Sequence, residues 1–423
     1  MSIPVYVLNL SILLALVWLL QRQHWAVALK PYFYPALLLK LLCGVLLGLL
    51  YFEYYGLGDT IAYYKGSLIL TELAHKDAAA YSRLVFFNEF SSEAFRASIP
   101  YSRFPGFTNS FFFLKLLSLL NLLTGSSYYL DGLYFSLFSF WGAGKLTATL
   151  NQAFPRYKPA AVIAFLFFPS VVFWSSGVLK DSLLFGSMCW LIALVLQLGQ
   201  RQRPSVAARW LAPLMLLLFY SIKFFLAYLL LPLLLLYLLF KYNPLQLKPA
   251  QQVLLMAAAV GVLAMAGLLF FKVYAQGFFY RNVVEGYAFM LAHSLDKPHI
   301  EFHDLAPGIK SFVLHAPEAA LSSIYRPFVW ENSNMLYLAL ALENLVLLLL
   351  TVLALLSAVR KRKVRITLEQ VLFGAIVLFL AVLFGLSTPN FGTLSRYRIA
   401  FLPFLVYLLL QSHYTQALLR KLR

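Results

Sequence analysis

Charged residues are scarce in this chain of 423 residues, and acids are scarcest: 16 Asp and Glu stand against 34 Lys and Arg. The charged share is 12%, whereas an ordinary soluble domain carries about 25%. A chain with so little polar material cannot cover a water-facing surface, which excludes a soluble globular protein. Cysteine is also rare. Cys43 and Cys189 both fall inside apolar runs, so we expect neither a disulfide framework nor a thiolate metal site.

Hydrophobic residues are abundant instead. They make up 62% of the chain, and the mean hydropathy is +0.78. Repeated apolar runs of roughly 16 to 24 residues fit membrane-spanning helices, which need about 20 residues each. We therefore predict an all-α, polytopic transmembrane bundle of about 11 spans, forming a single domain over residues 1–423. The predicted spans are 3–20, 32–51, 128–148, 159–176, 182–198, 208–222, 224–240, 251–271, 335–358, 367–387 and 397–412.

The placement of the basic residues predicts the orientation. One set of short connections holds 18 of the 34 Lys and Arg residues with Glu369 as the one acid beside them, whereas the connections on the other side hold nearly all the carboxylates. Cytoplasmic loops carry such an excess of Lys and Arg, so we expect the N-terminus outside and the C-terminus inside. The net charge of +18 then reflects topology, and no nucleic-acid partner is expected. The basic set comprises Arg22, Lys30, Lys145, Arg156, Lys158, Arg201, Arg203, Arg209, Lys241, Lys248, Arg360, Lys361, Arg362, Lys363, Arg365, Arg420, Lys421 and Arg423.

Two long connections, 52–127 and 273–334, are then outer loops. This orientation requires the apolar stretch Phe111–Leu123 not to cross the membrane. With Lys115 and Asn121 inside it, it suits a helix lying in the membrane interface. Leu68–Phe87 mixes apolar and charged residues and is either a second interfacial helix or an ordinary loop helix.

Asp59 is the first candidate for chemistry. It follows Gly58, which lets the backbone turn as it leaves the bilayer, and it would lie at headgroup level. A carboxylate there could act as a general base. Alternatively, Asp59 is merely the N-cap of the following helix, a position that Asp favours.

The tight outer turn within 168–182 is the second candidate. Gly177 is expected at the bend, with Lys180 and Asp181 at the start of the next helix. The helix dipole favours an acid there and disfavours a cation, so Lys180 is a possible phosphate contact. Ser175 and Ser176 could form a nucleophile pair with Lys180, although no oxyanion hole can be inferred. Lys223, at another outer turn, either faces an anionic substrate or anchors in the headgroups.

Two late arginines break the charge pattern. Arg396 and Arg398 lie at the outer end of a span, whereas every other dense group of basic residues is predicted to be cytoplasmic. Guanidinium groups bind phosphate oxygens bidentately. Alternatively, one arginine pairs with Glu331 or Glu343 and is structural.

Few charges lie deep in a predicted span. We expect Lys40, Lys145 and Lys272 to extend from span ends toward the headgroups, and Asp131 and Glu343 to lie near the outer ends of their helices.

Alternating polar residues in the second outer loop are the remaining candidate. On a strand, His299, Glu301 and His303 would share one face, as in some zinc sites. No helical His-Glu-x-x-His spacing is present, and histidines in a polar loop are usually solvated. We therefore predict no metal site and no cofactor.

Four features together resemble the GT-C superfamily of integral membrane glycosyltransferases. They are Gly58–Tyr63 after an early span; two surface helices before a later span; the turn from Pro169 to Lys180 and Asp181; and Arg396-Tyr397-Arg398 followed by Leu402-Pro403-Phe404. The turn sequence and Asn390–Thr393 are also similar to a bacterial group of membrane proteins linked with surface polysaccharide. The chain departs from the superfamily in three ways: an extra early span, no paired acid after Asp59, and no soluble C-terminal domain.

The resemblance implies an enzyme of the bacterial inner membrane. It would move a sugar from a polyprenyl-phosphate carrier to a glycan or lipid-linked acceptor on the outer face. Asp59 would be the base, and Tyr63, Lys180, Asp181, Lys223, Arg396 and Arg398 would bind substrate. The alternatives are a polysaccharide polymerase or O-antigen-type ligase, which needs no carboxylate base, and a transporter of lipid-linked saccharide.

Overall fold

The computed structural model of the chain describes residues 3–102, 108–243, 245–273, 277–360 and 366–421. Helices make up 82% of the structure, and the described residues form no strand. One isolated bridge joins His299 to Asn390. The all-α prediction is therefore confirmed. The basic residues Lys361, Arg362, Lys363, Arg365 and Arg423 lie outside the described residues.

Seven helices among the described residues are long and apolar enough to cross a membrane. Each overlaps a span predicted above, so the protein is membrane-embedded. They are α1 (Ile3–Gln21), α3 with its continuation η1 (Lys30–Tyr55), α11 (Lys180–Gly199), α13 (Phe224–Tyr242), α14 (Pro249–Val273), α17 (Met335–Arg360) and α18 (Leu368–Ser387).

The other four predicted spans are short, broken or bent. Residues 208–222 form α12 (Val206–Ile222), which has 17 residues. Residues 128–148 lie in α8 (Tyr128–Ala153), which meets the preceding α7 (Asn109–Thr124) at 115°. Residues 159–176 are divided among α9 (Lys158–Val162), η3 (Ile163–Phe167) and α10 (Pro169–Trp174), and residues 397–412 among η4 (Arg398–Ala400) and α20 (Leu402–Leu409). The total of about 11 spans stays a prediction.

The chain divides into two compact units. The first comprises Met1–Gln152, Val172–Leu194 and Arg203–Tyr228, and the second comprises Ala153–Val171, Val195–Gln202 and Leu229–Arg423. A single membrane domain over residues 1–423 stays a prediction.

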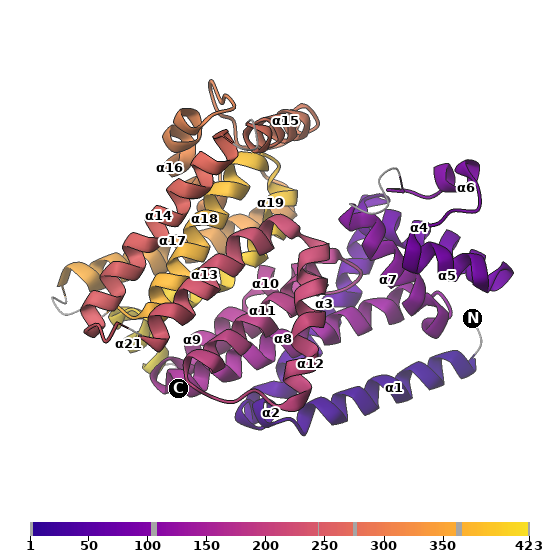
Figure 1. Cartoon of the computed structure of the whole chain (residues 1–423), viewed down its shortest axis with the longest axis horizontal. Coiled ribbons are helices and arrows are strands. Elements are labelled where there is room, and N and C mark those ends of the chain that lie inside the picture. Colours follow the sequence, from indigo (N-terminus) through magenta and orange to yellow (C-terminus); the bar gives the residue numbers. More distant parts are fainter. Residues whose placement is uncertain (1–2, 103–107, 244, 274–276, 361–365, 422–423) are drawn as a thin grey trace. The chain divides into compact units, whose positions relative to one another are not determined.

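The first unit contains the outer loop 52–127, which is helical. The stretch predicted as one surface helix, Leu68–Phe87, is two helices, α4 (Asp59–Lys76) and α5 (Ala78–Phe87). The break falls at Asp77, whose carboxylate accepts the Ala80 N–H at 2.9 Å as the N-cap of α5. A short helix, α6 (Glu93–Ser98), follows. Packing within this region is closest between α4 and α7 (Figure 1).

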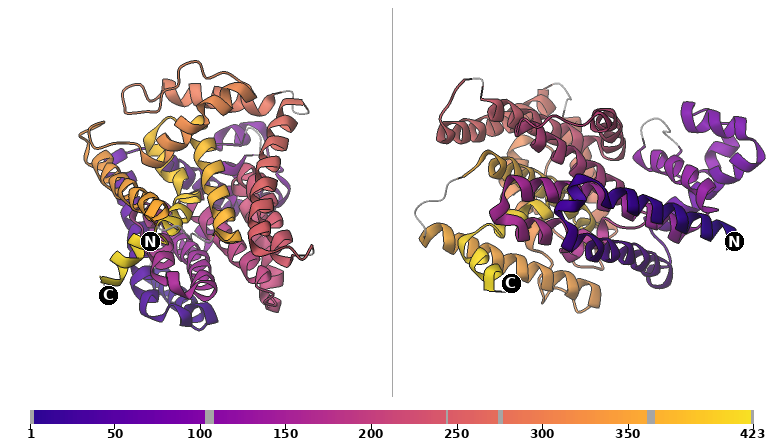
Figure 2. Two further views of the ribbon diagram at one scale, coloured as in Figure 1. Left: turned by 90° about the vertical axis from the view of Figure 1, so that its left-hand side faces the viewer. Right: turned by 90° about the horizontal axis from the view of Figure 1, so that it is seen from below.

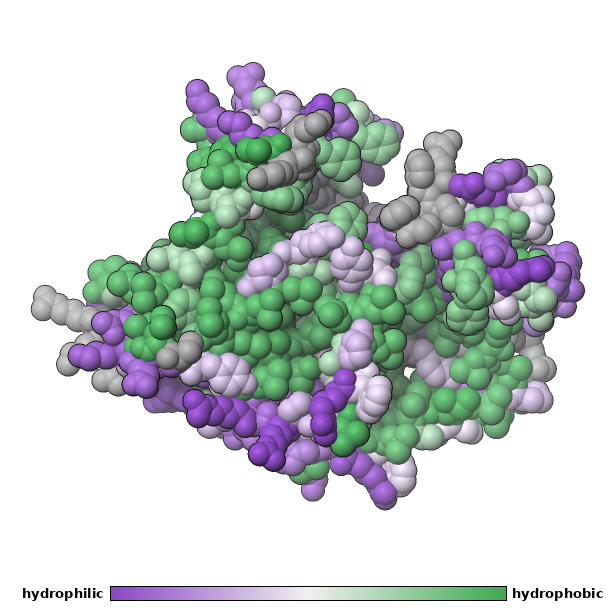
Figure 3. Space-filling view, viewed as in Figure 1, coloured by the Kyte–Doolittle hydropathy of each residue, from purple (hydrophilic) through white to green (hydrophobic). Residues whose placement is uncertain are grey.

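The second unit is built around α18. This helix packs against α14, against α20, and against α15 (Phe278–Ala292) and α16 (Ile309–Tyr325) of the second outer loop. Figure 2 shows α15 lying across one end of α14 and α18. Apolar side chains cover the visible face of α14, and hydrophilic residues gather at its two ends (Figure 3). This distribution is typical of a membrane-spanning helix. The remaining elements are α2 (His24–Ala28) in the first unit and η2 (Pro155–Tyr157), α19 (Phe391–Tyr397) and α21 (His413–Lys421) in the second.

Candidate functional site

Asp59 is the first residue of α4, and Gly58 holds the N-cap position. The prediction that Asp59 is itself the N-cap is therefore wrong, although an acid in the first turn still benefits from the helix dipole. Gly58 has a φ of +134°, and a Cβ at this residue would lie 2.6 Å from the ring of Tyr51. Both the backbone angle and the space require glycine here. The chain thus turns sharply out of η1 and places a half-buried carboxylate at the head of α4.

Thr60, the next residue, joins α4 to the turn between α10 and α11. Its hydroxyl donates to the Val178 carbonyl at 2.7 Å and lies 2.7 Å from the hydroxyl of Tyr128. A threonine hydroxyl has a single proton to donate, so Tyr128 is the donor in the second bond. The direction of this chain of hydrogen bonds is therefore fixed, from Tyr128 through Thr60 to the turn.

The turn itself is anchored at its bend. Gly177 has a φ of +69°, as the sequence predicts for a bend, and a Cβ there would lie 2.8 Å from Leu47 and 3.1 Å from the Gly44 carbonyl. Its N–H donates to Ser136 Oγ at 2.9 Å. Residues of α3, α4 and α8 therefore contact the turn that precedes Lys180. These contacts fix the position of the first residues of α11.

Lys180 lies beside Tyr63 in this unit. Its ammonium is 5.1 Å from the centroid of the Tyr63 ring, within the range of a cation–π interaction. It also donates to Asn109 Oδ1 and Ser110 Oγ, both at 3.0 Å, at the head of α7. Tyr63 lies one helical turn after Asp59, and residues four apart share a helix face. Two elements predicted separately, the loop of Asp59 and the turn of Lys180, therefore meet at Tyr63.

Asp181 and Lys223 form a buried ion pair. The distance from Lys223 Nζ to Asp181 Oδ1 is 3.1 Å, and the two side chains are 5% and 1% exposed. The resemblance to the GT-C superfamily implies a substrate-binding role for both residues. Their mutual contact places the turn between α12 and α13 against the start of α11.

Lys40 does not extend toward the headgroups, so that prediction is wrong. Its side chain is 4% exposed. The ammonium donates to Ser175 Oγ and lies 3.4 Å from the Val172 carbonyl, at the end of α10. The serines considered as nucleophiles, Ser175 and Ser176, are fully buried, and Lys40 rather than Lys180 is the lysine that we find bonded to Ser175. Lys40 of α3 therefore also holds the turn between α10 and α11, through Ser175 and Val172.

The two late arginines belong to the second unit, where both are buried. Arg398 donates to Asn344 Oδ1 at 2.8 Å and to the Ile324 carbonyl at 2.7 Å. Its acceptor on α17 is thus the neighbour of Glu343, one of the two acids considered as a structural partner.

The charges of Glu343 and Arg398 interact, and both acids also have hydrogen-bond partners of their own. Glu343 accepts the hydroxyl and the N–H of Ser170 at 2.6 and 2.9 Å. Glu331 accepts from Arg326 at 2.6 Å. The contacts of Arg398 bind η4 to α17.

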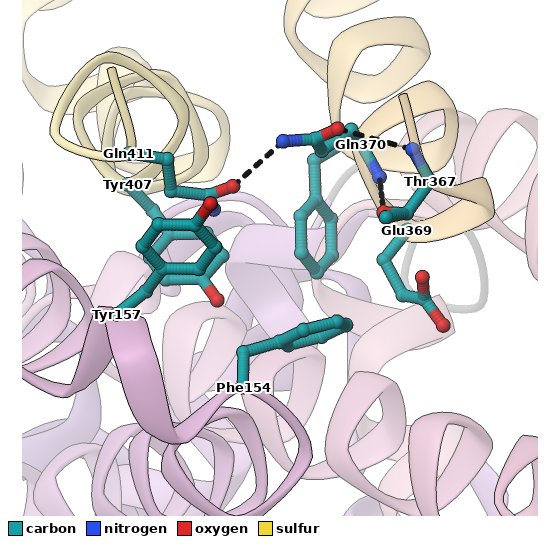
Figure 4. Close-up of a pocket in the computed structure, with 8 residues that line it drawn as sticks. Phe154, Tyr157, Thr367, Glu369, Gln370, Tyr407 and Gln411 are labelled. Carbon is teal, nitrogen blue, oxygen red and sulfur yellow. Dashed lines mark hydrogen bonds between the residues drawn. The ribbon is translucent and has the colours of Figure 1, made fainter. Parts of the chain in front are cut away.

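A small pocket in the second unit contains none of the predicted site residues. Its volume is about 50 Å³, enough for a few water molecules but not for a sugar. Aromatic rings and amides line it, and Gln370 Nε2 donates to Gln411 Oε1 at 2.8 Å across its rim (Figure 4). The lining residues are Phe154, Tyr157, Thr367, Glu369, Gln370, Phe373, Tyr407 and Gln411.

The alternating residues of the second outer loop do not form a strand: His299 lies in the isolated bridge with Asn390, and His303 lies in a turn. His299 Nε2 is 3.9 Å from Glu301, while the carbonyl of His303 lies 2.9 Å from His315 Nε2. In the part of the chain that the structure describes, no three His, Cys, Asp or Glu side chains are grouped as metal ligands would be.

Comparison with known proteins gives no assignment: no family model, no curated protein and no solved structure matches the chain. Four residues of the site were missed in the sequence: Thr60, Tyr128, Asn109 and Ser110. All are common polar residues near helix ends, and only their contacts distinguish them.

Proposed function

We propose that the protein is a membrane glycosyltransferase that moves a sugar from a polyprenyl-phosphate carrier to a glycan or lipid-linked acceptor on the outer face of the membrane. The observation that carries the proposal is that Tyr63, which follows Asp59 on the same face of α4, contacts the Lys180 ammonium. Asp59 precedes it by one turn of α4, and the Lys180 ammonium lies over its ring. A base and a phosphate-binding cation are the two groups that this transfer needs.

In the proposed reaction, Asp59 accepts the proton of an acceptor hydroxyl as that oxygen bonds to the anomeric carbon. The bond between the anomeric carbon and the phosphate oxygen breaks, and its electron pair leaves with the phosphate. Lys180 stabilises the negative charge on that leaving group. A phosphate is already a good leaving group, so no second acid is required.

The contacts around Lys180 support a positioning role for the neighbouring residues. Asn109 and Ser110 hold the Lys180 ammonium at one end, and the Tyr63 ring bounds it on another side. The buried pair of Lys223 and Asp181 positions the start of α11. Electrostatic stabilisation of this kind depends on groups fixed before the reaction, and the anchored turn supplies that rigidity.

Arg396 and Arg398, both in the second unit, remain in the proposal with different roles. The contacts of Arg398 with Asn344 and Ile324 support a positioning role for it. Arg396 is the arginine that we assign to phosphate.

The finer topology also belongs to the proposal. We infer about 11 spans in a GT-C-like bundle, located in the bacterial inner membrane, with the N-terminus outside and the C-terminus in the cytoplasm. The charge asymmetry of the loops supports this orientation. The 115° angle between α7 and α8 supports α7 as an interfacial helix, since a helix at that angle to a span can lie along the membrane surface.

The test is transfer of a labelled sugar from synthetic polyprenyl-phosphate donors to endogenous acceptors, in membranes that contain the protein. The wild type is expected to label an acceptor, and Asp59→Asn to abolish labelling. Full activity of Asp59→Asn would contradict the proposal. It would favour the polymerase or ligase alternative, which predicts a ladder of repeat units. Lack of any product together with movement of the carrier across the membrane would favour a transporter.

A further inference from the structure

The bend between α7 and α8 brings two oxygen acceptors into the interior of the first unit. The helices meet at 115°, and α7 ends at Thr124 before Gly125, which has a φ of +62°. Asp131 lies in the first turn of α8 and is fully buried. Asn121, one turn before the end of α7, is 1% exposed.

Only one of the two carboxylate oxygens of Asp131 accepts a hydrogen bond among the described residues. Thr124 donates to its Oδ1 at 2.7 Å, and its Oδ2 is buried with no hydrogen-bond partner among the described residues. No ion pair in the described part of the chain includes Asp131. A buried carboxylate with an unpartnered oxygen is costly, and intramembrane acids of this kind usually have a function.

Asn121 presents a second acceptor. Its amide nitrogen donates to Ser67 Oγ at 2.9 Å and to Thr71 Oγ1 at 3.2 Å. Both hydroxyls already donate to carbonyls of α4, so they accept from Asn121, which fixes the orientation of its amide. The Oδ1 atom is buried and has no hydrogen-bond partner in the described ranges.

These acceptors belong to one neighbourhood. Asn121 and Thr124 are three residues apart, so they share a face of α7, and Thr124 contacts Asp131 directly. Tyr64 lies beside this group, because its hydroxyl donates to the Ser126 carbonyl at 2.6 Å. Burial raises the pKa of the Tyr64 phenol, and the nearby Asp131 carboxylate raises it further.

The local electrostatics favour a cation between the two helices. The end of α7 carries the negative pole of its dipole, and the start of α8 carries a positive pole that stabilises the Asp131 carboxylate. Interrupted membrane helices bind sodium in this way, through helix C-terminal ends and side-chain oxygens. A single carboxylate supplies one negative charge, which matches a monovalent ion better than a divalent one.

We propose that Asp131, Asn121 and Thr124 form a binding site for a hard monovalent cation, most simply sodium, at the junction of α7 and α8. The cation is ligated by Asp131 Oδ2, Asn121 Oδ1 and the hydroxyl oxygen of Thr124, and it holds the two helices at their angle. The site is separate from the glycosyl transfer proposed above and does not depend on it.

The test uses the purified full chain in lipid nanodiscs, with sodium chloride titrated into choline chloride at constant ionic strength. Sodium is expected to raise the unfolding midpoint saturably, by about 5 °C, as for a ligand that binds only the folded state. The Asp131→Asn variant is expected to lose this shift. Asp77→Asn is the matched control, because Asp77 is exposed and Asn caps α5 equally well. It should keep the full shift.

Direct binding of radioactive sodium provides a second measurement that does not depend on unfolding. One ion per chain is expected for the wild type, and more than tenfold weaker binding for Thr124→Val. This measurement decides the question if Asp131→Asn fails to fold. No sodium-specific shift in the wild type would overturn the proposal, as would a shift that persists in Asp131→Asn. Stabilisation by acid alone, with no added effect of sodium, would mean that the site takes a proton, and the proposal would be wrong.

Discussion

Lys223 and Asp181 are joined at 3.1 Å, and neither side chain is more than 5% exposed. Removal of one partner from a buried pair leaves an uncompensated charge, which costs about 3–5 kcal/mol. We therefore expect Lys223→Met to lower the unfolding midpoint strongly, and the double variant Lys223→Met with Asp181→Leu to recover most of the loss. Thermal unfolding of the purified variants measures both effects. Equal destabilisation by the single and the double variant would show that the pair is not energetically coupled.

Asp59→Asn should reduce sugar transfer by about 10²–10⁴-fold, the usual contribution of a general base. The folded protein should remain abundant, because Asn retains the shape of the side chain at the head of α4. Initial rates at saturating donor measure the effect, and Asp77→Asn provides an exposed acid at another helix start as a control. Comparable loss in both variants would indicate a general effect on stability.

Lys180→Met should weaken donor binding and slow transfer, while Tyr63→Phe should change little. Phenylalanine keeps the ring face that the ammonium contacts at 5.1 Å, whereas methionine removes the charge but retains much of the side-chain volume. We expect a loss of about 10²–10³-fold for Lys180→Met and partial activity for Lys180→Arg. Measurement of both KM and kcat separates binding from chemistry. A large loss in Tyr63→Phe with wild-type activity in Lys180→Met would reverse the assigned roles.

Gly177→Ala and Gly56→Ala form a matched pair for the turn. Both glycines have a positive φ, +69° and +67°, so each alanine introduces backbone strain of about 1–3 kcal/mol. A Cβ at Gly177 would also collide with Leu47 at 2.8 Å, whereas one at Gly56 would meet nothing within 4 Å. We expect a clearly larger fall in the unfolding midpoint for Gly177→Ala. Similar falls would mean that the turn relaxes around the added atom.

Cysteine labelling in intact cells tests the orientation. Cys43 and Cys189 are both buried, so the natural chain provides a low background. A cysteine in place of the exposed Glu89 should react with an impermeant maleimide added outside, and one in place of the exposed Arg203 should react only after lysis. The opposite pattern would invert the topology and move Asp59 to the cytoplasmic side.

The sequence was sufficient for the long apolar helices, because length and hydropathy determine a span almost by themselves. It was insufficient where a helix is interrupted. The break at Asp77 requires its side-chain bond to Ala80, and the bend after α7 requires Gly125 in a left-handed conformation. Neither feature changes the hydropathy averaged over a window of residues, so the sequence predicts a single helix over 68–87.

Within the site, the sequence located charges but could not predict their partners. Asp59, Lys180, Asp181 and Lys223 stood out because charge is rare in this chain. Their contacts join residues tens of positions apart, as with Lys180 and Asn109 or Lys223 and Asp181. Lys40 was placed at a span end on hydropathy alone, and its bond to Ser175 depends on the packing of α3 against the turn.

The chain of hydrogen bonds from Tyr128 through Thr60 to Val178 has a consequence for substrate entry. Because the Thr60 hydroxyl donates to the Val178 carbonyl and both residues are fully buried, α4 cannot move away from the turn without breaking this bond and leaving the Val178 carbonyl without it. A conformational change that admits a long isoprenoid chain would therefore have to carry α4 and the turn together as one rigid body. The opening for the lipid tail should then form along another boundary of the first unit, where apolar contacts separate at lower cost.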